Sequence, residues 1–77
     1  MTLSQFNRFD EGEQMEAIWE YAVHVAFRED DMYRYELLRI DDFYVELKHH
    51  KTHDVLQGLR TFNSTTLLEP DVWQLKL

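Results

Sequence analysis

Histidine is concentrated in one short stretch, where it could bind a metal ion. Residues 49–54 read His-His-Lys-Thr-His-Asp, which places three imidazoles and a carboxylate within six positions. These side chains are ligands for zinc, nickel or copper. Adjacent strand residues point to opposite faces, so only one of His49 and His50 could join His53. We interpret the stretch as a polar hairpin tip, and keep a metal site using His49, His50 and His53 as the last alternative.

Catalysis finds little support in the other polar residues. Glu16, Glu20 and His24 are spaced four apart, as on one helical face, but helical di-iron sites draw such ligands from four helices. The chain has no cysteine, and neither Ser4 nor Ser64 lies in a Gly-x-Ser-x-Gly motif. Its two glycines stand alone, so there is no glycine-rich phosphate loop. We expect no catalytic residue, no cofactor and no enzymatic activity.

Acidic residues dominate the charge of the chain. There are 15 Asp and Glu against 8 Lys and Arg, and the formal net charge is -7. Nucleic-acid binders usually carry a basic surface, so we expect neither nucleic acid nor an anionic membrane as a partner. The N-terminus has no basic start followed by an apolar run, and no apolar stretch reaches the roughly 20 residues that span a bilayer. The sequence therefore predicts a cytoplasmic protein.

The elements that must position these groups begin with a hairpin at residues 33–47, which read YRYELLRIDDFYVEL. Asp41 and Asp42 are favoured turn residues, and a two-residue turn sets Ile40 opposite Phe43. One face of the hairpin then carries Leu38, Ile40, Phe43, Val45 and Leu47. The opposite face carries Tyr35, Leu37, Arg39, Tyr44, Glu46 and Lys48. This separation of apolar from polar residues predicts that the first face is buried.

A long amphipathic helix is predicted before the hairpin, from about Glu11 to Glu29. Asp10 and Glu13 fit the side-chain exchange of a capping box at its start. Apolar residues recur at spacings of three and four, namely Met15, Ile18, Ala22, Val25 and Ala26. Further apolar residues widen this face beyond half of the circumference, namely Trp19, Val23 and Phe27. Such a helix needs two covering surfaces, of which the sheet is one.

A third strand is predicted from Val55 to about Phe62. Its register stays open, because Leu56 shares one face with Phe62 while Leu59 shares the other with Val55. A bulge at Gly58 would let the strand change phase.

The C-terminal residues predict a short helical turn near residues 65–75, where Pro70 fits a first helical turn. Residues 1–77 are therefore expected to form a single α+β domain. One long N-terminal helix packs on a three-stranded antiparallel β-meander, and the short C-terminal helical turn follows.

Large apolar and aromatic side chains outside the predicted core indicate a function. Tyrosine and tryptophan are favoured where one end is buried and the other is wet, as in protein interfaces. The candidate interface residues are Trp19, Val23, Phe27, Tyr35, Leu37, Tyr44 and Trp73. We interpret the chain as a non-enzymatic interaction domain that forms a homodimer and can also dock another protein. The alternative is an acidic regulator or inhibitor that binds a basic protein surface.

Three runs of residues resemble a known group of proteins. They are Arg39 to Leu47, then Arg60 to Ser64, then Leu67 to Pro70, within the C-terminal two-thirds of the chain. They are similar to a family of small bacterial proteins of unknown function, mostly from Bacteroidetes. The resemblance implies a bacterial cytoplasmic origin and supplies no catalytic residues.

Overall fold

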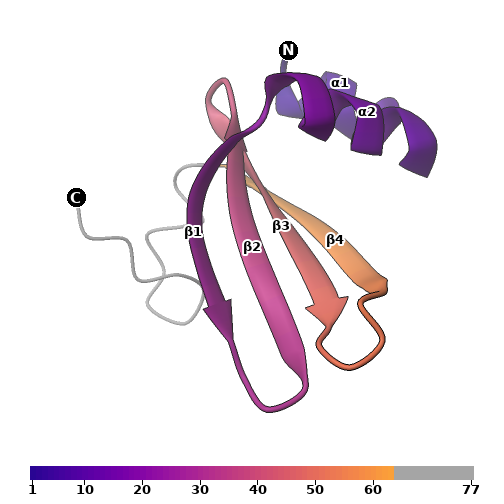
Figure 1. Ribbon diagram of the computed structural model, residues 1–77. Helices are drawn as coiled ribbons and strands as arrows, with labels where there is room; N and C mark the ends of the chain where they lie inside the picture. The colour runs from indigo at the N-terminus through magenta and orange to yellow at the C-terminus, as the bar shows by residue number, and fades with distance from the viewer. Residues whose placement is uncertain (64–77) are drawn as a thin grey trace.

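The computed structural model describes residues 1–63, which form two helices followed by four strands (Figure 1). The helices are α1 (Leu3–Arg8) and α2 (Glu11–Tyr21). The strands are β1 (Val23–Glu29), β2 (Tyr33–Ile40), β3 (Phe43–His50) and β4 (Leu56–Asn63). All neighbouring strands are antiparallel, and their order in the sheet is β1-β2-β3-β4.

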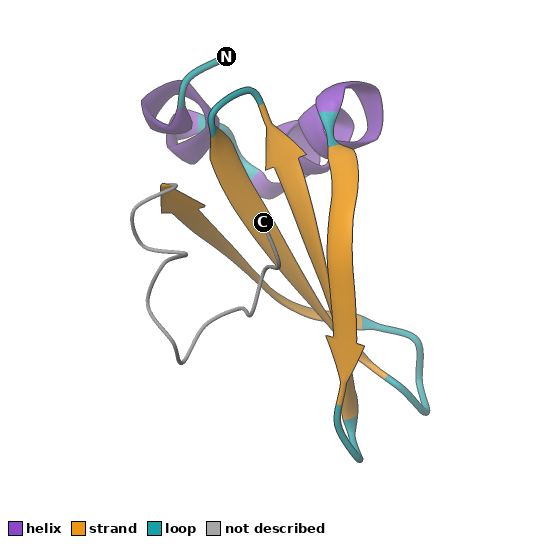
Figure 2. Ribbon diagram, turned by 90° about the vertical axis from the view of Figure 1, so that its left-hand side faces the viewer, coloured by secondary structure: helices purple, strands orange, loops and turns teal. Residues whose placement is uncertain are grey.

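The helices cover only one end of one sheet face. They lie across the end at which β2 turns into β3, whereas the β1–β2 and β3–β4 loops project from the opposite end (Figure 2). We call the face beneath the helices the helix face and the other the second face. The helix face carries Leu38, Ile40, Phe43, Val45 and Leu47, and the second face carries Leu37, Tyr44, Glu46 and Phe62.

The predicted hairpin is confirmed residue by residue. β2 and β3 pair without a break from Tyr33 opposite His50 to Ile40 opposite Phe43. Asp41 begins the turn at φ 53°, a left-handed conformation that aspartate tolerates better than most residues. The turn therefore fixes the register that buries the apolar set.

The prediction of a long helix from Glu11 to Glu29 is wrong, and so is the three-stranded sheet. α2 ends at Tyr21, and the following residues form β1, which gives the sheet a fourth strand. Strand-favouring residues alternate there, namely Val23, Val25 and Phe27. As an edge strand, this stretch hydrogen-bonds to β2, whereas a helix of that length would have left a wide apolar face uncovered.

The N-terminal residues form helix α1, which was not predicted from the sequence. Thr2 caps it by accepting a bond from the backbone N–H of Gln5, and the Gln5 side chain accepts one from Thr2 N–H. Asp10 and Glu13 make the same exchange at the start of α2, as predicted. α1 thereby delivers Phe6, which is completely buried, to the core.

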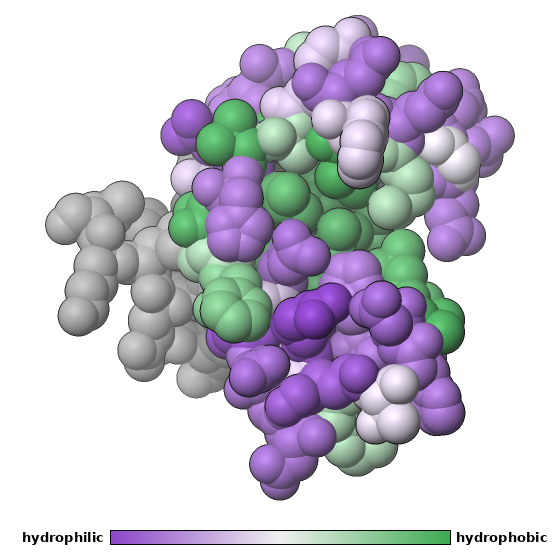
Figure 3. Space-filling view, in the orientation of Figure 1, coloured by the Kyte–Doolittle hydropathy of each residue, from purple (hydrophilic) through white to green (hydrophobic). Residues whose placement is uncertain are grey.

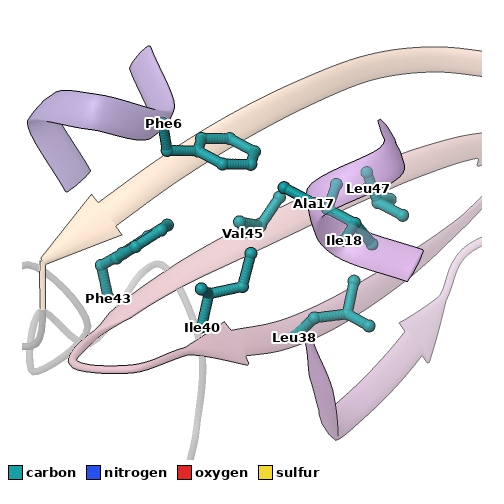
Figure 4. Packing of buried hydrophobic residues seen from close by; sticks show 8 residues of the cluster. All are labelled: Phe6, Ala17, Ile18, Leu38, Ile40, Phe43, Val45 and Leu47. Carbon is teal, nitrogen blue, oxygen red and sulfur yellow. The ribbon is translucent and has the colours of Figure 1, made fainter. Parts of the chain in front are cut away.

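The main core lies between the helices and the helix face. Figure 4 shows Phe6 from α1 and Ala17 and Ile18 from α2 pointing toward the strand residues beneath them. The Phe6 and Phe43 rings pack with their centroids 5.5 Å apart. This contact anchors α1 to the sheet.

Strand β4 changes phase beside Gly58. Leu59 lies opposite Leu47 and Leu56 opposite His49, with a register shift between Lys48 and His49. Leu56 and Leu59 thus both pack toward the main core, whereas Phe62 joins Leu37 in a smaller cluster on the second face. The helical turn predicted near residues 65–75 lies outside the described residues.

Candidate functional site

The candidate site is the outer side of β1. Within residues 1–63, β1 has a single neighbouring strand, β2, and only Ala26 among its seven residues is half-buried while the others are exposed. The unpaired N–H and C=O groups of an edge strand form a template for another strand. Within the part of the chain that the structure describes, the outer edge of β1 thus has no strand partner, and most of its residues are exposed.

Apolar side chains accumulate along this edge. Trp19 is 90% exposed, and Val23 and Phe27 are each 57% exposed. We call the following set the apolar strip: Trp19, Tyr21, Val23, Val25 and Phe27. Figure 3 shows hydrophobic side chains at the surface in the middle of the molecule, between hydrophilic regions above and below. Val23 pairs with Arg39 on the second face and Phe27 with Glu36 on the helix face, so the strip follows the β1 edge on both of its sides. Isolated apolar residues are ordinary on a surface, whereas several along one edge are typical of an interaction site.

A bulge divides β1 into two parts. The register with β2 shifts between His24 and Ala26, so Val25 is the extra residue. Beyond it the strand alternates regularly, with Phe27 opposite Glu36 on the helix face. Bulges on edge strands hinder pairing locally, so Ala26–Glu29 is the part that remains regular enough to add a strand.

The structure divides the seven predicted interface residues into separate groups. Three belong to the apolar strip, namely Trp19, Val23 and Phe27. Tyr35 and Tyr44 are half-buried on the second face, and Leu37 there is completely buried against Phe62. Trp73 lies outside the described residues. Tyr21 and Val25 were missed, although the alternation through Val23, Val25 and Phe27 was a usable signal for this edge.

The predicted histidine cluster is split between the two sheet faces. The His50 and His53 rings lie 4.7 Å apart, and His50 Nδ1 accepts bonds from the backbone N–H groups of Thr52 and His53. His49 lies on the helix face, where its Nε2 is 3.5 Å from a Glu36 oxygen. Across residues 1–63, no group of three or more His, Cys, Asp or Glu side chains is placed to hold a metal ion.

His24 also lies away from its expected neighbours. Glu16 and Glu20 are exposed on α2, whereas His24 is on β1 with its Nε2 4.0 Å from the other oxygen of Glu36. The single carboxylate of Glu36 thus lies near both the His24 and the His49 imidazole. When the imidazoles are protonated, this arrangement provides two ion pairs that link β1, β2 and β3.

Comparison of the chain with protein-family models, curated proteins and solved structures finds no match. The likeness to the Bacteroidetes family stays a prediction. Among the described residues, no helix is both long and apolar enough to cross a membrane. The functional argument therefore depends on the geometry of the apolar strip.

Proposed function

We propose that the chain is a non-enzymatic interaction domain that self-associates through edge strand β1. The observation that carries this proposal is the apolar strip, whose large side chains lie beside a strand edge. An added strand would satisfy the exposed backbone groups of β1 and cover its side chains together. A second copy supplies a strand of the same length and the same apolar character.

The regular part of β1 suits antiparallel pairing with itself. A two-fold axis at Phe27 sets the two Phe27 rings opposite each other and Ala26 opposite Arg28, while the bulge residue Val25 falls opposite Glu29 at the end of the paired segment. Closed two-fold symmetry of this kind is the commonest arrangement in homo-oligomers. The β1 segment carries one Arg and one Glu, so the strand contributes little repulsion in spite of the overall charge of -7.

The strand pair alone makes a small contact, because seven residues span only about 23 Å. Stable interfaces bury roughly 1,200–2,000 Å² in total, so further surface is required. Trp19, at the end of α2, is the most exposed large apolar residue in the described chain and lies within the strip. Tryptophan is enriched among residues that dominate binding energy, so we expect Trp19 to complete the interface.

The test is sedimentation velocity on the wild-type chain and on Phe27→Lys. We expect the wild type to shift from monomer to dimer between about 10 and 500 μM, and the variant to weaken dimerisation at least about tenfold. Lysine is a residue that natural proteins use to block edge pairing, and a two-fold axis would set two lysines together. Phe27 is 57% exposed, so the variant should retain the wild-type fold, which circular dichroism verifies.

Val55→Lys is the matched control, because Val55 is 50% exposed in the β3–β4 loop and outside the strip. It introduces the same charge and should dimerise like the wild type. A wild-type chain that remains monomeric throughout the range would contradict the proposal. So would equal effects of the two lysines, since these would reflect charge alone.

A second candidate is an acidic regulator that binds a basic protein surface. α2 favours it, because its exposed side carries Glu11, Glu13, Glu16 and Glu20. Partners captured from a native cell extract through this side should be released by about 0.5 M salt, which screens surface charges strongly. Retention of all partners at that salt would remove the electrostatic basis of this candidate.

A further inference from the structure

A hollow lies on the second face, away from the helices. Its volume is about 450 Å³, and its lining includes Arg28, Tyr35, Glu46, Lys48, Gly58 and Arg60. Sites for small molecules typically measure about 300–1,000 Å³. The hollow is therefore large enough for a small organic ligand.

The hollow is positive, although the chain is acidic. Strands β1, β3 and β4 contribute Arg28, Lys48 and Arg60 to the lining, and among residues 1–63 Glu46 is the one carboxylate that lines it. Asp30 lies outside the lining but interacts electrostatically with Arg28 and Lys48. The lining residues that the structure describes, three cations and one anion, have a formal charge of +2, against -7 for the whole chain. This local excess favours an anionic ligand.

Glu46 positions the two arginines. Its side chain is only 3% exposed, and Arg60 Nε donates to its Oε1 at 3.0 Å. An Arg28 guanidinium nitrogen lies 3.8 Å from the other oxygen, Oε2. The Arg28 and Arg60 side chains are still 46% and 61% exposed, so each guanidinium also faces solvent. A buried carboxylate thus holds two accessible arginines in fixed positions.

Aromatic rings further restrict the conformations of the Arg28 and Lys48 side chains. The Arg28 guanidinium lies 4.2 Å from the centre of the Tyr35 ring, and Lys48 Nζ lies 4.0 Å from that of Tyr33. Such cation–π contacts orient long side chains that would otherwise sample many rotamers. Side chains that are ordered before binding reduce the entropic cost of capturing a ligand.

Gly58 lines the hollow and has open space beside it. It lies opposite Lys48 on the second face, and a Cβ atom added to it would meet nothing within 4 Å. Glycine within a strand is destabilising by roughly 0.5–1 kcal/mol relative to alanine, and it often marks a close approach by a ligand. A larger side chain at position 58 would therefore extend into the open space of the hollow.

We propose that this hollow binds a small organic phosphate. A phosphate monoester carries a charge of about −1.5 to −2 at neutral pH, which matches the local excess of +2. Guanidinium groups bind phosphate oxygens through paired N–H donors, and Lys48 supplies a further positive charge. The volume exceeds the needs of the phosphate alone, and Tyr35 provides a wall for the organic part.

The experiment is an NMR titration of the full chain, labelled with ¹⁵N, at low ionic strength. The probes are phenyl phosphate, inorganic phosphate and benzoate. We expect saturable shifts for phenyl phosphate that centre on Arg28, Lys48 and Gly58, with benzoate at least about tenfold weaker. Inorganic phosphate should compete for the same residues. Absence of saturable shifts up to about 10 mM phenyl phosphate, or equal affinity for benzoate, would overturn the proposal.

Three variants locate the site. Gly58→Leu fills the hollow without changing any charge, and should abolish binding while its unfolding midpoint stays at or above the wild-type value. Arg60→Gln removes a phosphate contact and should weaken binding at least about tenfold. Arg39→Gln removes one charge from the same sheet face outside the hollow and should bind like the wild type. Unchanged binding by Gly58→Leu, or equal losses in Arg39→Gln and Arg60→Gln, would show that the probe senses only diffuse charge.

Discussion

Replacement of Glu46 by alanine should lower the free energy of unfolding more than any other single carboxylate substitution in the described chain. Glu46 lies in the centre of the second face, and its side chain is 3% exposed. It accepts a bond from Arg60 Nε at 3.0 Å and lies 3.8 Å from an Arg28 nitrogen. The variant removes both interactions from a site where water has little access.

These two contacts set a lower bound on the loss in the free energy of unfolding. A hydrogen bond to a charged group contributes about 1.5–3 kcal/mol, and the Arg60 bond is of this kind. The Arg28 pair is longer and partly exposed to solvent, so it adds at most about 1 kcal/mol. Water can hydrate both arginines once the Glu46 carboxylate is removed. The total loss in the free energy of unfolding therefore stays at about 2–4 kcal/mol. A domain of this length has a stability of about 4–12 kcal/mol, so the variant should lose a large part of it.

Urea unfolding followed by circular dichroism measures the effect. Glu46→Gln keeps an acceptor and the side-chain volume, so it should lose only about 1 kcal/mol. Glu20→Ala, on the exposed side of α2, should remain within about 0.5 kcal/mol of the wild type. In a double-mutant cycle, Glu46→Ala and Arg60→Ala should show a coupling of at least about 1 kcal/mol. Additive losses, or a loss below about 1 kcal/mol in Glu46→Ala, would refute the reasoning.

Two further substitutions test the fold. Phe6→Ala removes a completely buried ring and should cost about 3–5 kcal/mol in urea unfolding, clearly more than Phe9→Ala at a half-buried position. The backbone N–H groups of Tyr33 and Met32 donate to Asp30 and hold the pKa of its carboxyl below the usual value. Because the folded pKa is lowered, the stabilisation is present above the unfolded value of about 3.9 and is lost as pH falls through the folded one. Asp30→Asn should therefore be less stable at neutral pH and lose less stability below about pH 4, and an acid-unfolding profile parallel to the wild type would contradict this.

The part of the fold that could be predicted is the part fixed by neighbouring residues. The β2–β3 register follows from the Asp41–Asp42 turn and an alternation that continues on both sides of it. The capping box at Asp10 is local in the same way. Thr2 and Gln5 carry the same signature at α1, and it was usable before the structure was known.

Residues 22–29 could not be assigned from local pattern because they satisfy two periods at once. Val25 and Ala26 continue the helical spacing of α2, whereas Val23, Val25 and Phe27 alternate as in a strand. The strand prevails through hydrogen bonds to β2, which are contacts between segments distant in the sequence. The hollow could not be predicted from the sequence for a similar reason. The pairing of Glu46 with Arg60 depends on the register shift near Gly58, which the local pattern of β4 does not determine.

Net charge is a poor guide to which ions a thin two-layer domain attracts. Acidic residues of α2 lie above one sheet face, while Arg28, Lys48 and Arg60 line the hollow on the other. Layers of secondary structure pack about 10 Å apart, and the Debye length in physiological salt is about 8 Å. The helix carboxylates are therefore largely screened from the second face. Nearby groups therefore matter more to the hollow than the charges of α2 do, namely its three cations, Glu46, and Asp30, which interacts with Arg28 and Lys48. A chain of charge -7 can in this way carry a local cluster of cations.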